Sequence, residues 1–176
     1  MSRNAQKILI ISSLNENEEG KMGYIYKHDV VPVLEKMINE GTYSNKYLYD
    51  FICKYWSSIE DRYDLETLFY HLDFFRFNYK CRKEITKQLK KQLKKQMDAD
   101  GYITVYRGFN ENSREDGNSF TLSKDVAIYF SNRWGEKEGY VNKYKVHIKK
   151  VVAFITDRNE AEIIVDPDDV ILLETL

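Results

Sequence analysis

Three short segments in the second half of the chain carry side chains whose types and order suit chemistry. Residues 106–108 read Tyr-Arg-Gly, residues 119–121 read Ser-Phe-Thr, and residues 160–162 read Glu-Ala-Glu. An arginine offers phosphate oxygens a planar, permanently charged fork. Two glutamates separated by one residue lie on the same side of a β-strand, where both can act on one substrate. The order of the three segments is more informative than any one of them, because acidic pairs at this spacing recur elsewhere, for example at Glu136 and Glu138.

The sequence lacks the signatures of several common activities. Its eight glycines form neither G-x-G-x-x-G nor G-x-x-x-x-G-K-[ST], and no G-x-S-x-G marks an acyl-transfer nucleophile. The histidines His28, His71 and His147 show no metal-ligand spacing to a cysteine or carboxylate pair, so we expect no metal site. Cys53 and Cys81 offer neither a disulfide framework nor a C-x-x-C pair, which favours a reducing compartment.

Length and composition predict one globular domain. The chain has 176 residues, of which 43% are hydrophobic and 31% charged, typical values for a folded domain spanning residues 1–176. The apolar run at residues 8–11 is too short for a signal-peptide core, and no stretch approaches the roughly 20 apolar residues of a membrane helix. We therefore expect a soluble, cytoplasmic protein with no membrane partner.

Residues 1–99 predict a helical part. Apolar residues recur at helical spacing in four stretches, with Gly41 placed to end the first and with Ser44 and Asp64 placed to begin the second and third. The predicted helices are residues 29–40, a helix capped by Ser44, a helix capped by Asp64, and residues 80–97.

Residues 100–176 predict a strand-rich part. Aromatic and β-branched residues alternate or cluster in short runs, interrupted by one short helix capped by Ser123. The predicted strands are residues 102–107, 140–148, 151–155, 161–165 and 170–173. Helices followed by strands indicate the α+β class.

The small net charge of −1 hides a strongly basic helix. Residues 80–95 carry eight basic residues and one acid, so this segment has a net charge of +7 and the rest of the chain −8. Such a face can meet a nucleic acid or another acidic partner. The alternative interpretation is a solvated helix face whose lysines aid solubility.

With their order and context, the three segments resemble those of the mono-ADP-ribosyltransferases of the Arg-Ser-Glu class, the group that includes clostridial binary toxins, related exoenzymes and bacteriophage proteins. The resemblance covers about residues 102–167. In that family an arginine ends a strand, a Ser-Thr-Ser segment follows, and a Glu-x-Glu segment completes the NAD pocket; here these are Arg107, Ser119 and Glu160 to Glu162. The toxin-like members also place a phenylalanine and an arginine about eleven and fourteen positions after the serine, which match Phe130 and Arg133.

The resemblance implies an NAD-binding site of known parts. NAD would be the substrate, Glu162 would stabilise the cationic ribose, and Ser119 would orient Glu162. Arg107 and Arg133 would bind the pyrophosphate. The nicotinamide would stack on Phe130 and lie close to the backbone of Gly108.

Glu160 bears on the acceptor. In the family, a glutamate at this position accompanies transfer to arginine, and such an acceptor needs a carboxylate to pair with it and take a proton. The resemblance also implies N-terminal helices packed on a mixed, two-sheet β core. It differs from the family at Phe120, which stands in place of a threonine, and in its short loop at residues 156–159.

The expected function is transfer of ADP-ribose from NAD to an arginine of a bacterial cytoplasmic protein, with release of nicotinamide. Two alternatives stay open among enzymes, an NAD glycohydrolase and a transferase that modifies nucleic acid. A third is a non-catalytic binding protein with a vestigial NAD pocket.

Overall fold

The computed structural model describes residues 7–12, 21–59, 61–133, 135 and 137–176. The chain divides into two compact units, Met1–Leu68 and Phe69–Leu176, which we call the N-terminal and C-terminal units and describe separately. The prediction of one domain over residues 1–176 stays a prediction.

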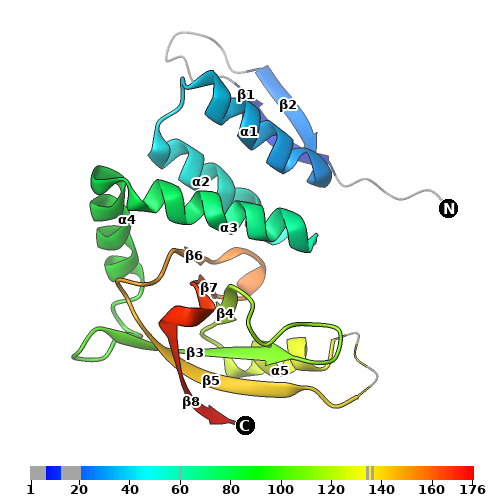
Figure 1. The fold of residues 1–176 in the computed structure, drawn as a ribbon, viewed down its shortest axis with the longest axis vertical. Coiled ribbons are helices and arrows are strands. Elements are labelled where there is room, and N and C mark those ends of the chain that lie inside the picture. Colours follow the sequence, from blue (N-terminus) through cyan, green and yellow to red (C-terminus); the bar gives the residue numbers. More distant parts are fainter. Residues whose placement is uncertain (1–6, 13–20, 60, 134, 136) are drawn as a thin grey trace, which may run out of the picture. The chain divides into compact units, whose positions relative to one another are not determined.

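The N-terminal unit combines two strands with helices (Figure 1). Strands β1 (Lys7–Ser12) and β2 (Lys21–Tyr26) pair antiparallel; the sequence analysis did not predict them. The 3-10 turn η1 (Lys27–Asp29) leads into α1 (Val30–Glu40), and α2 (Asn45–Tyr55) is followed by η2 (Trp56–Ser58).

Capping residues set the ends of α1 and α2 as predicted. Gly41 ends α1 at a φ of 66°, a conformation that glycine adopts without steric cost. Ser44 caps α2, its hydroxyl accepting a hydrogen bond from the Tyr47 amide at 3.2 Å. Both helices turn fully buried side chains inward, Leu34 from α1 and Ile52 from α2.

Helix α3 (Arg62–Phe77) begins earlier than predicted. Its first amides are capped by Asp61, whose carboxylate accepts hydrogen bonds from Tyr63 at 2.8 Å and Asp64 at 3.3 Å. The prediction that Asp64 caps this helix is therefore wrong.

Helix α4 (Tyr79–Gln92) ends earlier than predicted. Ile85, Leu89 and Leu93 are buried at the predicted spacing. Met97, however, pairs with Ile103 in an antiparallel bridge. The fourth apolar residue of the series thus belongs to the turn that starts the sheet.

The C-terminal unit contains one six-stranded antiparallel sheet. Its strands are β3 (Tyr102–Phe109), β4 (Ser119–Thr121), β5 (Tyr140–His147), β6 (Ala153–Ile155), β7 (Glu162–Ile164) and β8 (Val170–Thr175). They pair in the order β6-β7-β4-β3-β5-β8. The α+β class is confirmed; the expected mixed, two-sheet core is not, because these pairings are all antiparallel within one sheet.

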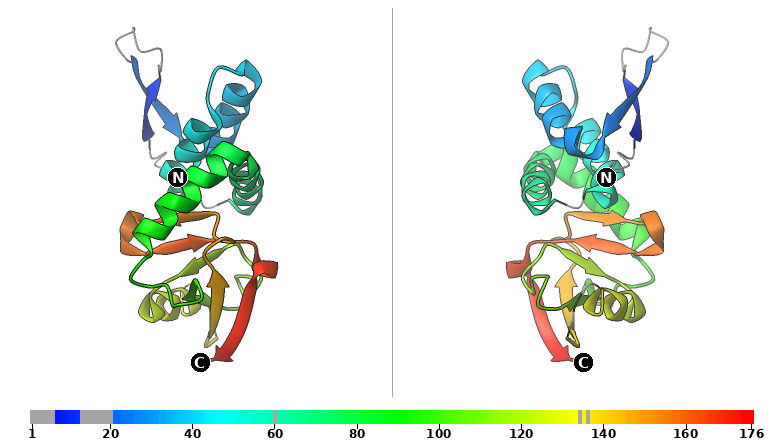
Figure 2. Two further views of the ribbon diagram at one scale, coloured as in Figure 1. Left: turned by 90° about the vertical axis from the view of Figure 1, so that its left-hand side faces the viewer. Right: turned by 90° about the vertical axis from the view of Figure 1, so that its right-hand side faces the viewer.

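The shortest strand pairing lies at the centre of the sheet. Strands β3 and β5 pair over eight residues, whereas β3 and β4 share only the pair Tyr106 and Thr121. Figure 2 shows the β6–β7 end of the sheet running across the direction of β5 and β8. Strands β3 and β4 therefore share no further ladder pair on either side of Tyr106 and Thr121.

Helix α5 (Lys124–Ser131) packs closely on β3. As predicted, Ser123 caps it, accepting a hydrogen bond from the Val126 amide at 3.3 Å. A Cβ at Gly108 would lie 1.8 Å from the carbonyl oxygen of Ala127, so only glycine permits this approach. The described helices include none that is both long and apolar enough to cross a bilayer.

Candidate functional site

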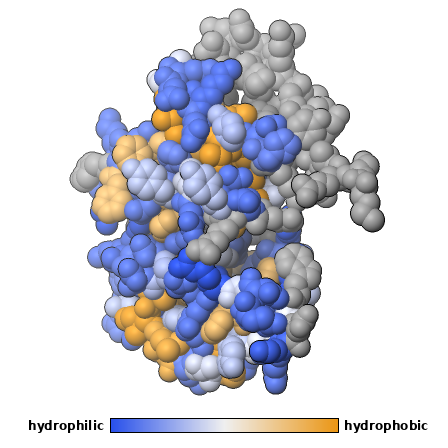
Figure 3. All heavy atoms as spheres, turned by 45° about the vertical axis from the view of Figure 1, so that its right-hand side comes forward, coloured by the Kyte–Doolittle hydropathy of each residue, from blue (hydrophilic) through white to orange (hydrophobic). Residues whose placement is uncertain are grey.

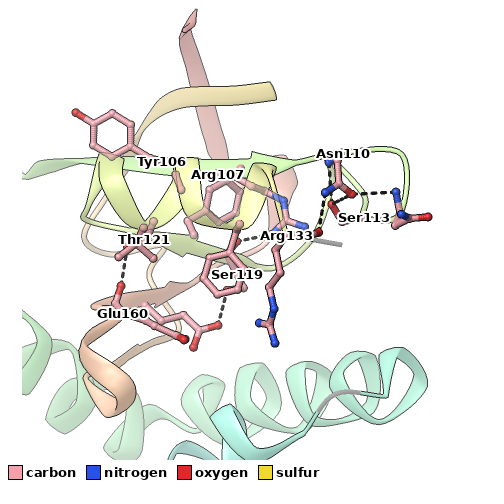
Figure 4. Close-up of a pocket in the computed structure, with 15 residues that line it drawn as sticks. Tyr106, Arg107, Asn110, Ser113, Ser119, Thr121, Arg133 and Glu160 are labelled. Atoms are coloured by element: carbon pink, nitrogen blue, oxygen red, sulfur yellow. Dashed lines mark hydrogen bonds between the residues drawn. The ribbon is translucent and has the colours of Figure 1, made fainter. Parts of the chain in front are cut away.

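A pocket of about 260 Å³ opens where β3 and β4 separate, and we call it the Glu162 pocket. Its walls come from β3, β4, α5 and the residues after it, the loop after β3, and the turn and first residue of β7 (Figure 4). The lining residues predicted from sequence are Arg107, Gly108, Ser119, Phe130, Arg133, Glu160 and Glu162. The fold thus brings together in one cavity residues that lie up to 55 positions apart in sequence.

Ser119 and Glu162 are joined directly. The Ser119 hydroxyl donates a hydrogen bond to Oε1 of Glu162. Strand pairing fixes this contact, because β4 and β7 run antiparallel with Ser119 opposite Ile164 and Thr121 opposite Glu162. A hydroxyl bonded to one carboxylate oxygen holds the other in a set direction.

Glu160 reaches the pocket by a different route from the predicted one. Strand β7 begins at Glu162, so the expectation that strand alternation places both glutamates on one side is wrong. Glu160 lies in the preceding turn, and Ala161 between the two has a φ of 45°. The turn is held by Thr121, whose hydroxyl donates to the Glu160 carbonyl at 2.6 Å, and by the Leu122 amide, which donates to Ala161 at 3.1 Å.

The turn before β7 carries unusual backbone conformations. Arg158 and Asn159 both have a φ of 58°, and with Ala161 they are the positive-φ residues other than glycine among the described positions. Each such residue costs roughly 1–2 kcal/mol relative to ordinary backbone. Glu160 is thus presented by a strained turn that its hydrogen bonds maintain.

The Arg107 guanidinium is used within the fold. Its Nε and Nη2 donate to the Arg114 carbonyl at 3.0 and 2.6 Å, and its Nη1 donates to the Ser119 carbonyl. The guanidinium also lies over the Phe120 ring at 5.8 Å. Burial lowers the pKa of Arg107, yet a guanidinium stays protonated at neutral pH. Arg107 therefore fixes the position of Ser119 and, through it, of Glu162.

The side chains of Arg133 and Arg107 point in different directions. Figure 4 shows Arg107 directed toward the loop that carries Ser113, whereas Arg133 extends down toward the level of Glu160. The Arg133 guanidinium lies 5.6 Å from the centre of the Phe130 ring. Phe130 and Arg133 thus add an aromatic ring and a cation to the lining that also holds the two glutamates.

Gly108 lines the pocket as predicted. The structure gives it a second reason to be glycine, the close approach of α5 described above. Its approach to the carboxamide of a ligand stays a prediction.

Sequence reasoning missed Asn110, whose side chain anchors the loop after β3. Asn110, only 6% exposed, donates from Nδ2 to the carbonyls of Ser131 and Arg133, both at 2.9 Å. Its Oδ1 accepts from the Asn112 amide at 2.9 Å, so the loop turns back on itself and is tied to the end of α5. The available signal was an asparagine directly after a strand, a position that favours such a turn.

A hydrogen-bond network centred on the buried Asn142 lies across the β3–β5 pairing from Arg107. Asn142, opposite Arg107 in the β3–β5 pairing, is 3% exposed and donates to Glu115 at 2.7 Å and to the Tyr144 hydroxyl at 3.1 Å. Its Oδ1 accepts from Thr175 at 2.7 Å. Sequence analysis named none of these residues as part of a site, because they come from strands distant in sequence.

The comparisons with known proteins identify no relative: no protein-family model, no curated protein and no solved structure matches the chain. The described residues also include no group of three or more His, Cys, Asp or Glu side chains arranged to hold a metal ion.

Proposed function

We propose that the Glu162 pocket binds NAD and transfers its ADP-ribose to an arginine of an acceptor protein. The observation that carries the proposal is the Ser119–Glu162 hydrogen bond in a pocket that also holds Phe130, Arg133 and Glu160. An oriented carboxylate suits a reaction whose transition state spreads positive charge over a ribose.

Each side chain has a task in this reaction. The bond between nicotinamide and the ribose anomeric carbon breaks, and its electron pair leaves with nicotinamide, which becomes neutral. Glu162 stabilises the charge that develops on the ribose. Phe130 stacks on the nicotinamide ring, and Arg133 pairs with the pyrophosphate. A nitrogen of the acceptor arginine bonds to the anomeric carbon and gives its proton to Glu160.

The size of the pocket indicates which part of NAD enters it. Pockets that enclose a whole drug-sized ligand have volumes of about 300–1,000 Å³, and the Glu162 pocket has about 260 Å³. It therefore suits the nicotinamide and its ribose. We assign the pyrophosphate to Arg133, which lines the pocket beside the Phe130 ring and extends toward the level of Glu160, whereas the Arg107 fork holds the Arg114 and Ser119 carbonyls.

Labelled NAD tests the proposal. The full chain is incubated with biotin-labelled NAD and bacterial lysate; nicotinamide release is measured, and label is followed separately in protein and nucleic acid. Glu162→Gln should reduce both readouts by about 100-fold or more, the scale of removing one well-placed electrostatic group. Glu160→Gln should remove protein label while sparing nicotinamide release. Glu138→Gln, an exposed glutamate outside the pocket, is the matched control.

Three results would contradict the proposal. Nicotinamide release without labelled macromolecule identifies an NAD glycohydrolase. Label in nucleic acid alone moves the acceptor away from protein arginine. Absence of NAD turnover supports a non-catalytic binding protein.

A further inference from the structure

A second depression in the C-terminal unit, of about 580 Å³, is lined by cations; we call it the α4 groove. Its lining residues are Arg82, Lys83, Thr86, Lys87, Lys90 and Lys149. The first five belong to α4, and Lys149 follows β5. Among the described residues that line it, none is acidic and none is apolar. A site of this composition selects a polyanion.

The wall that carries Lys149 is fixed by its backbone. The buried side chain of Arg76 donates from Nη2 to the Lys149 carbonyl oxygen. The Lys149 amide donates to Nδ1 of His147 at 3.1 Å. Both backbone polar groups of Lys149 are thus bonded, which holds this lysine at the groove beside α4.

The cations along α4 follow the helical repeat. Lys83, Lys87 and Lys90 occupy positions i, i+4 and i+7, so they lie on one face. At 1.5 Å per residue they span roughly 10 Å along the axis. A row of this kind contacts successive charges of an extended chain.

An exposed aromatic ring contacts Arg82, another lining residue of the groove. Phe77, the last residue of α3, is 62% exposed, and the Arg82 guanidinium lies 5.3 Å from the centre of its ring. A cationic groove beside an exposed aromatic ring is the arrangement that binds single strands, because unpaired bases stack on the ring while lysines follow the phosphates. The bases of a duplex are already stacked on one another and do not reach such a ring.

An acidic protein and an anionic membrane surface fit the α4 groove less well. Protein interfaces gain most of their affinity from apolar and aromatic anchors in closed pockets, whereas the aromatic ring beside this groove, that of Phe77, is 62% exposed. Membrane-surface helices insert an apolar face, whereas Ile85, Leu89 and Leu93 of this helix are buried in the protein. We propose that the α4 groove binds single-stranded nucleic acid, with Lys87, Lys90 and Lys149 on phosphates and a base stacked on Phe77.

Fluorescence anisotropy of the full chain with labelled 20-mers of single-stranded RNA and DNA tests the proposal. The assay contains no NAD, so its outcome is independent of the transferase proposal. Lys87→Gln/Lys90→Gln should weaken binding by about tenfold or more at 50 mM salt and lower the slope of log affinity against log salt by about 1.4, since each single-strand phosphate contact contributes about 0.7. Phe77→Ala should weaken binding by about fivefold or more, and Phe77→Tyr should restore it.

Lys94→Gln/Lys95→Gln is the matched control, because it removes the same charge from exposed residues outside the groove; it should change affinity by less than about twofold. The difference between the RNA and DNA arms identifies which strand is preferred. Absence of binding at low salt overturns the proposal, and so does equal weakening by the two double variants. Tighter binding to a 20-base-pair duplex, or equal competition by polyglutamate, also overturns it.

Discussion

The Glu162 pocket and the α4 groove use positive charge in opposite ways. In the pocket, three nitrogens of Arg107 donate to backbone carbonyls, so this charge is part of what holds the site together. In the groove, all the cations except Lys149 stand on α4, whose stability comes from the buried residues on its other face. The Arg107 charge is therefore structural, whereas we propose that the groove charges bind a ligand.

The sheet and the α4 groove also differ in the apolar side chains that they expose. Strand β8 is an edge strand of the sheet, and Ile171, Leu172 and Leu173 on it are all about half exposed. In Figure 3, orange apolar patches lie both high and low in the view, among blue hydrophilic surface. The groove lining lacks such side chains among its described residues.

The largest predicted effect comes from replacing the arginine fork by a single amine. Arg107→Lys keeps the positive charge but cannot span the carbonyls of Arg114 and Ser119 at once. We expect a loss of about 1–3 kcal/mol in the free energy of unfolding, the cost of leaving part-buried polar groups unbonded. Urea denaturation followed by circular dichroism measures it.

The groove supplies the control for this prediction. Lys87→Gln/Lys90→Gln removes two charges from an exposed face and should change the free energy of unfolding by no more than about 0.5 kcal/mol. Equal losses in the two variants would show that the distinction between structural and ligand-serving charge is wrong.

Local signals predicted the basic face of α4 and much of the secondary structure. The caps at Ser44, Gly41 and Ser123 depend on residues within one turn of the helix end, and all three are confirmed. The lysine face of α4 follows from helical spacing alone. The C-terminal end of α4 was predicted wrongly because Met97 pairs with Ile103 across a turn. Helical periodicity cannot predict such a tertiary contact.

The sequence predicted which residues line the Glu162 pocket but not the strands, turns and contacts that position them. Strand β4 has three residues and exists only because β3 and β7 flank it, so no local pattern marks it. Glu160 was assigned to a strand, whereas positive φ at Ala161 places it in a turn. Asn110 and Asn142 act through partners more than twenty positions away. Long-range pairing decides all of these contacts.

A smaller effect sharpens the comparison by testing the strained turn. Ala161→Gly removes the cost of a φ of 45° and should raise the free energy of unfolding by up to about 1 kcal/mol, after the greater chain entropy of glycine is subtracted. If Glu160 acts on the acceptor, the looser turn should also lower transfer of label by a few-fold.

Thr156→Gly provides the control for the turn. Thr156 lies in the same loop without positive φ, so glycine there should lower the free energy of unfolding by about 0.5–1 kcal/mol. A destabilising Ala161→Gly would show that the turn is relaxed and that Glu160 is not held under strain.

The smallest effect concerns a charge at the rim of the pocket. Asp116 forms an ion pair with Arg114, whose carbonyl accepts the Arg107 bonds, and this hydrogen bond lowers the pKa of Asp116 below its ordinary value of 3.8. A carboxylate with a depressed folded-state pKa contributes stability above pH 3.8, and the contribution disappears as pH falls through the folded-state pKa. The melting temperature of Asp116→Asn should therefore lie slightly below that of the wild type at pH 7, and the gap should shrink as pH falls below 3.8. A gap that does not shrink would mean that the side chain acts through packing. A small, pH-dependent difference in melting temperature would mean that Asp116, like the groove lysines, contributes little to stability. Burial and hydrogen bonds to carbonyls would then explain why Arg107 contributes more.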